Sequence, residues 1–181
     1  NYSFTAKYGG SANYSEASSS GEFKVIDNFL TAKLEYKDFK EYYNAKKQLV
    51  IKLVDSNNKP ISGETIYFCL KQKAYKLTTD SDGNAKITIN LNSGDYDCDI
   101  IFNESKSYHN LSGKIKVTVL KTVQASDLTK KYNTSGQYIA IFYNPNGKAL
   151  GNTKVQLSIG NKKYNFTTLA NGVLRININL N

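Results

Sequence analysis

The chain repeats its own sequence at a constant offset of 89 residues, and this repeat limits what it can fold into. The stretch from Gln48 to Asn92 aligns without a gap on the stretch from Gln137 to Asn181. Sixteen aligned positions are identical, including Asp38 with Asp127, Tyr43 with Tyr132, Gly83 with Gly172 and Leu91 with Leu180. A repeat of this length indicates two copies of one structural unit.

Short alternating apolar runs separated by turn residues indicate strands in both copies. Ile66, Phe68 and Leu70 alternate with other residues, and Pro60 and Gly83 mark turns before and after them. Between residues 29 and 122 we predict strands at 30–36, 48–54, 65–70, 75–79, 85–91, 96–102 and 114–120, with a polar connection at 40–46. The predicted fold class is all-β, with tandem Ig-like antiparallel β-sandwich domains.

The repeat divides the chain into three parts. Residues 29–122 supply a complete Ig-like domain, and residues 123–181 repeat only its first strands. The last two strands have a counterpart at the other end of the chain, because residues 2–26 align without a gap on residues 96–120. Residues 1–28 therefore read as the final two strands of an Ig-like repeat.

The two partial domains complement each other in sequence. An isolated two-stranded hairpin is marginally stable in water, so it needs a sheet to pack on. We predict that residues 1–28 of a neighbouring molecule or repeat complete residues 123–181, head to tail. The complementing side chains would be Tyr2, Phe4, Ala6, Tyr8, Phe23 and Val25, beside Leu157, Ile159, Ile176, Ile178 and Leu180. A unit taken from one long continuous chain would give the same linear array.

Composition excludes several classes of protein. The net charge of +9 comes from lysines, with Arg175 as the single arginine, and these lysines are spread along the chain. Nucleic-acid binding is therefore not expected, although attraction to anionic cell-wall polymers stays open. No apolar stretch is long enough to insert into a membrane. The first 20 residues are polar, so a targeting segment would have been removed or would lie in a longer precursor.

Three segments carry a family resemblance. They are NNKPISGETI with its second version NPNGKALGNTKV, KAYKLTTDSDGNAKITINL with KKYNFTTLANGVLRININL, and SGDYDCDIIF. They resemble the Ig-like repeats of large archaeal and bacterial cell-surface adhesin-like proteins, particularly the Asn-, Lys- and Tyr-rich arrays of methanogens. The resemblance implies an extracellular, wall-associated structural module without catalytic residues. It also leaves open a ligand-binding adhesin domain that recognises glycans or cell-wall polymers.

No reactive constellation is visible, so we expect no enzyme, no cofactor and no metal site. His109 is the single histidine and has no partner from which a catalytic or metal centre could be built. Asp80, Asp82 and Asn84 resemble the start of a calcium loop, but Leu91 occupies the position of the required glutamate. A hairpin turn that needs Gly83 explains the motif equally in both copies.

Three sets of residues are candidates for modification or binding. Cys69 and Cys98 both lack a counterpart cysteine, which fits a disulfide, yet strand alternation places them on opposite faces. N-glycosylation is possible at the sequons Asn13, Asn103, Asn110, Asn133 and Asn165. An exposed aromatic surface for sugar stacking could come from Tyr36, Tyr42, Tyr43, Tyr108 and Tyr132.

Overall fold

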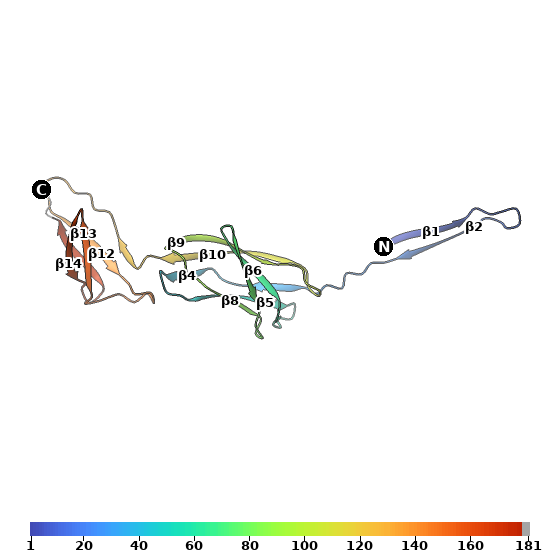
Figure 1. The fold of residues 1–181 in the computed structure, drawn as a ribbon, viewed down its shortest axis with the longest axis horizontal. Coiled ribbons are helices and arrows are strands. Elements are labelled where there is room, and N and C mark those ends of the chain that lie inside the picture. The colour runs from blue at the N-terminus through green and yellow to red at the C-terminus, as the bar shows by residue number, and fades with distance from the viewer. Residues whose placement is uncertain (179–181) are drawn as a thin grey trace.

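The computed structural model describes residues 1–178, and this part of the chain contains fifteen strands and no helix. Figure 1 shows an N-terminal hairpin, a sandwich in the middle and a smaller set of strands toward the C-terminus, arranged in a row. The all-β prediction is confirmed. The hairpin consists of β1 (Tyr2–Tyr8) and β2 (Ala17–Phe23), which are paired antiparallel.

The middle part, residues 29–122, is a two-layer sandwich. One sheet has the order β3-β5-β8, with β3 (Ala32–Glu35), β5 (Gln48–Asp55) and β8 (Asn84–Thr88). The other has the order β4-β10-β9-β6-β7, with β4 (Phe39–Tyr42), β6 (Thr65–Leu70), β7 (Lys73–Thr78), β9 (Gly94–Phe102) and β10 (Leu111–Leu120). All neighbours run antiparallel except β4 and β10, which are parallel.

The sandwich core is formed by the inward residues of both sheets. Alternate positions of each strand are buried, as strand geometry requires. The core includes Leu49, Ile51, Leu53, Ile66, Phe68, Ala85, Cys98, Ile100, Phe102, Ile115, Val117 and Val119. This contiguous core supports the middle part as a domain of its own.

Strand β4 is the element that the sequence pattern missed, because it lies where a polar connection was predicted. Its inward side chains are Phe39, which is half-buried, and Glu41, which is 3% exposed. The Glu41 carboxylate accepts the backbone N–H of Lys47 at 3.0 Å, which compensates part of its burial cost. A buried carboxylate interrupts the apolar alternation by which strands are recognised.

The C-terminal part repeats the strands and the pairing of the middle sandwich. It contains β11 (Val123–Ala125), β12 (Gly136–Phe142), β13 (Lys154–Ile159), β14 (Lys162–Thr167) and β15 (Val173–Ile178). The pair Leu49–Ile87 recurs as Tyr138–Ile176, at the offset of 89. The strands form sheets β11-β12-β15 and β13-β14. Ala140 on β12 and Leu174 and Ile176 on β15 are buried.

The predicted turn at Gly83 has a clear physical basis. Gly83 has a φ of +76°, and a Cβ at this position would lie 2.5 Å from the Leu53 carbonyl oxygen. Only glycine tolerates both conditions. The Asp80 carboxylate caps the turn by accepting the N–H groups of Asp82 at 3.0 Å and Asn84 at 2.9 Å. Gly172 repeats this conformation in the second copy, with a φ of +75°.

Candidate functional site: an open sheet edge and an exposed hairpin

The second copy has an open sheet edge where the middle sandwich has a neighbouring strand. In the middle sandwich β6 lies between β7 and β9. The corresponding strand β13 pairs with β14 and with no other strand among residues 1–178. Its inward residues Val155, Leu157 and Ile159 are half-buried, whereas their counterparts in β6 are buried. The second core is therefore open on the side where β9 covers the first.

The N-terminal hairpin has the same construction as the β9–β10 pair, which has no counterpart after β13 among residues 1–178. At an offset of 94 residues, the pairs Tyr2–Phe23 and Tyr8–Ala17 correspond to Tyr96–Val117 and Phe102–Leu111 in the same register. The loops also agree, because the Ser11 N–H donates to the Tyr14 carbonyl at 2.8 Å and the Ser105 N–H donates to the Tyr108 carbonyl at 3.0 Å. Sequence alignment and backbone pairing identify the same match independently.

One face of the hairpin is apolar and exposed. Its large side chains are Tyr2 (58% exposed), Phe4 (55%), Tyr8 (48%), Phe23 (53%) and Val25 (69%), and Ala6 lies among them. The counterparts of Phe4, Ala6, Tyr8, Phe23 and Val25 in the middle sandwich are between 0 and 3% exposed. Exposed apolar rows of this kind are common at interaction surfaces of soluble proteins.

The hairpin and the second copy lie at opposite ends of the middle sandwich (Figure 1). The chain enters the sandwich beside the loop before β10 and leaves after Leu120, at the other end of that strand. Ten residues of strand span roughly 30 Å. Only residues 24–26 separate the end of β2 from Asp27, and the four Cα–Cα steps from Phe23 to Asp27 reach at most about 14 Å. In the structure the hairpin forms a sheet of its own and pairs with no strand of the second copy.

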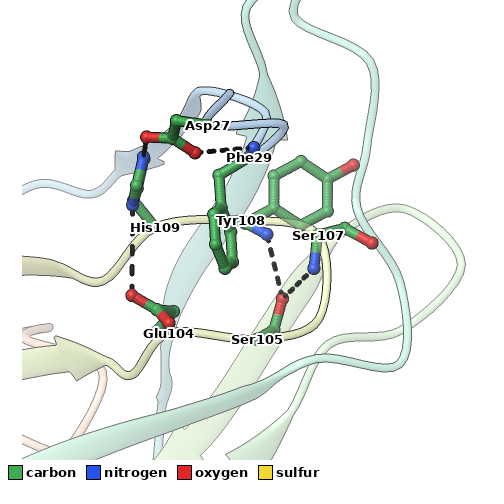
Figure 2. A network of polar contacts seen from close by, with 7 residues as sticks. All are labelled: Asp27, Phe29, Glu104, Ser105, Ser107, Tyr108 and His109. Atoms are coloured by element: carbon green, nitrogen blue, oxygen red, sulfur yellow. Dashed lines mark hydrogen bonds and ion pairs between the residues drawn. The ribbon is translucent and has the colours of Figure 1, made fainter. Parts of the chain in front are cut away.

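Asp27 and Phe29 fix this entry point to the sandwich, as Figure 2 shows. The Asp27 carboxylate lies 2.8 Å from Nε2 of His109, and Glu104 lies 4.0 Å from Nδ1 of the same ring. The ring of Phe29 stacks on His109 with centroids 4.7 Å apart. A hydrogen bond from the Phe29 N–H, together with His109, holds the pKa of Asp27 below its usual value. Sequence reasoning treated His109 as isolated, because these partners are distant in sequence or lack a recognisable motif.

The candidate disulfide between Cys69 and Cys98 is not formed in the structure. Cys69 and Cys98 are both free thiols and lie on opposite faces of the sheet, since Leu70 rather than Cys69 is paired with Cys98. Cys98 points into the core and is 2% exposed, whereas Cys69 is half-buried on the outer face. Burial raises the pKa of the Cys98 thiol to about 11. The alternation that argued against the pair decides the matter.

The other candidate residues are located as follows. The sequon asparagines Asn13, Asn103, Asn110, Asn133 and Asn165 are all exposed, and their glycosylation stays a prediction. The five tyrosines do not form one surface: Tyr36 and Tyr108 pack against the core, Tyr42 contacts Tyr143 with ring centroids 5.2 Å apart, and only Tyr43 and Tyr132 are exposed. The Asp80 carboxylate is engaged by the turn and by Lys86 at 2.8 Å.

Within residues 1–178, no group of three or more His, Cys, Asp or Glu residues is placed to hold a metal ion. The same part of the chain has no helix that is long and apolar enough to cross a membrane.

Comparisons with known proteins agree with the sandwich architecture. Residues 40–128 match the macroglobulin domain MG4, an Ig-like domain, and this supports the β-sandwich class for the middle part. No curated protein matches the chain.

Solved structures with some likeness include a Ca²⁺-stabilised adhesin that helps an Antarctic bacterium bind ice (13% identity, 97% of this chain and 48% of that chain, TM-score 0.37). Another is the Escherichia coli alpha-2-macroglobulin activated by porcine elastase (12% identity, 97% and 21%, TM-score 0.36). A third belongs to a 1.5-MDa bacterial ice-binding adhesin (10% identity, 93% and 60%, TM-score 0.36). The chain thus spans less than two thirds of each of these structures.

Proposed function

We propose that this protein is a structural module of an extracellular filament or stalk on the cell surface, joined head to tail by β-strand complementation. The observation that carries the proposal is the shared register. The hairpin β1–β2 repeats the pairing of β9–β10, and the second copy lacks that pair beside β13. The hairpin is thus the donor and the edge of β13 the acceptor, and the two are complementary parts of one domain. The hairpin of a second copy of the chain, or of an adjoining repeat, fits this edge.

The middle sandwich supplies the register of the proposed contact. There, Ile66 is paired with Phe102, Phe68 with Ile100 and Leu70 with Cys98. Applying the offsets of 89 and 94 places Val155 opposite Tyr8, Leu157 opposite Ala6 and Ile159 opposite Phe4 of the neighbour. Strand β1 would run antiparallel to β13, and backbone hydrogen bonds would satisfy the open edge.

Burial of the apolar face provides the driving force. Each fully buried large side chain contributes about 1.5–3 kcal/mol, and five such side chains on the hairpin are about half exposed or more. Part of this gain offsets the cost of association. A contact between different surfaces is heterologous, and because the two surfaces lie at opposite ends of the molecule we expect an open linear array and not a closed ring.

The extracellular setting rests on the resemblance to cell-surface repeats and on five exposed sequons. Assignment to the methanogen type rests on the same sequence resemblance. The competing function is recognition of glycans or cell-wall polymers, and no observation favours it. The tyrosines expected to form an aromatic surface do not lie together: two pack on the core, one contacts Tyr143 and two are exposed.

Cysteine cross-linking in the full 181-residue chain tests the register. The middle-sandwich pair Cys69–Asp99 corresponds to Ser158 and Thr5 of the neighbour. We expect Thr5→Cys with Ser158→Cys, in a Cys69→Ser background, to give a ladder of covalent multimers, either by oxidation or with a short bifunctional thiol reagent. A chain that stays monomeric by sedimentation and gives no ladder would refute strand complementation.

A matched control places the second cysteine on the far strand. Asn165 on β14 is exposed, as Ser158 is, but it is separated from the open edge by β13. Thr5→Cys with Asn165→Cys should therefore cross-link weakly. Equal ladders from both pairs would show nonspecific association and would contradict the proposed register.

A further inference from the structure

In the middle sandwich the β9–β10 pair is bound along two edges. β9 pairs with β6 on one side, and β10 pairs with β4 on the other, where an aspartate takes part. β10 pairs antiparallel with β9 and also parallel with β4, which places Val117 opposite Phe39 and Leu120 opposite Tyr42. Just before β4, the Asp38 carboxylate accepts the backbone N–H of Lys116 at 2.9 Å. Hydrogen bonds from N–H groups to carboxylates are among the stronger ones in proteins.

Both counterparts of this second edge are unpaired in the described chain. Residues 117–120 of β10 pair with β4, whereas β2 ends at Phe23, the counterpart of Val117. The corresponding hairpin residues Val25 and Ile26 are 69% and 65% exposed. Residues 126–131, which correspond to β4 and the residues just before it, form no strand, and Leu128 is 39% exposed. Neither residues 24–26 nor residues 126–131 are part of a strand, although their counterparts in the middle sandwich pair with each other.

On the basis of the strand complementation above, we propose that residues 127–131 form a second docking edge for the neighbour's hairpin. Residues 23–26 of the neighbour bind parallel to residues 128–131, and both segments become strands on assembly. The Asp127 carboxylate accepts the backbone N–H of the neighbour's Glu22, in the same way as Asp38 accepts that of Lys116. Leu128, opposite Phe23, closes the core as Phe39 does.

This role explains why Asp127 is identical to Asp38 although both are exposed. Nothing in the local turn of residues 126–131 requires an aspartate, whereas the docked arrangement does. In one respect the proposed contact of Asp127 is weaker than the contact between Asp38 and Lys116 on which it is based. The neighbour offers Glu22 where the sandwich has Lys116, so two carboxylates approach each other across an exposed, screened surface.

Two substitutions with opposite expected effects test the proposal in the 181-residue chain. Asp127→Asn removes the charge on the acceptor and should weaken association, measured by sedimentation, about tenfold or more. Glu22→Lys copies the residue of the middle sandwich and should strengthen association. Asp38→Asn is the matched control, because it should lower the denaturation midpoint of the middle sandwich and leave association unchanged.

Hydrogen exchange distinguishes docking from local folding effects. In assembled protein, the amides of residues 128–131 should gain protection, and Asp127→Asn should reduce it without changing exchange in β12 and β15. If neither substitution alters association while the cross-link between positions 5 and 158 still forms, the second edge is wrong and strand complementation stands. If that cross-link is also absent, strand complementation itself is refuted.

Discussion

Removing the ring of Phe4 should weaken assembly by a predictable amount. Phe4 is 55% exposed, and its counterpart Cys98 is 2% exposed in the complete sandwich. A phenylalanine buries roughly 200 Å², so docking removes about 100 Å² of the Phe4 side chain from water, worth about 2.5 kcal/mol at ~25 cal/mol per Å². An alanine retains a small part of this, so Phe4→Ala should weaken the head-to-tail contact by about 2 kcal/mol, or about 30-fold.

Sedimentation velocity over a range of concentrations measures this effect. Ser3→Ala is the control, because Ser3 lies on the opposite face of the same strand and should leave the association constant unchanged. The Phe4 ring also lies over Gly21 of β2, so a variant outside both hairpin strands is needed to separate docking from hairpin stability. Val25→Thr meets this requirement and should weaken assembly about tenfold by burying a hydroxyl group. Unchanged association in both variants would refute burial of this face.

Three further outcomes are expected for the middle sandwich. Thr79→Val should destabilise it by about 1–3 kcal/mol in urea denaturation, because the buried Thr79 hydroxyl accepts the Glu64 N–H at 3.0 Å and the substitution leaves that N–H unpaired. Gly83→Ala should lower the denaturation midpoint by a similar or larger amount, since its φ of +76° and the adjacent carbonyl both oppose a Cβ. At pH 8 a thiol reagent should modify Cys69 in the native protein, and Cys98, with its pKa raised to about 11 by burial, only after unfolding.

Sequence reasoning was most successful where repeat and alternation agreed. The strand at residues 65–70 was predicted with its observed bounds, and its copy at residues 154–159 follows from the offset of 89. Both strands have apolar residues at every second position and lie between clear turn signals. The hairpin was recognisable for the same reason, since its apolar residues alternate and align with a second segment.

Long-range and polar features could not be predicted in this way. Strand β4 carries a buried Glu41 and pairs in parallel with a strand about 78 residues later, so its neighbours in sequence give no indication of its role. The contact between Asp27 and His109 joins residues 82 apart. Alternation indicated that Cys69 and Cys98 face opposite ways, and the sequence left a disulfide between them open; in the structure both are free thiols.

The overlooked strand also bears on how assembly is directed. A hairpin bound only to β13 would be held along a single strand edge. Such edges accept many partners and slip in register. With residues 127–131 as a second edge, the hairpin must fit between an antiparallel neighbour on one side and a parallel neighbour on the other. The middle sandwich excludes the hairpin, because its own β9 and β10 already occupy both positions. In the proposed array each copy of the chain therefore offers one donor hairpin and one acceptor edge, so that all copies point the same way.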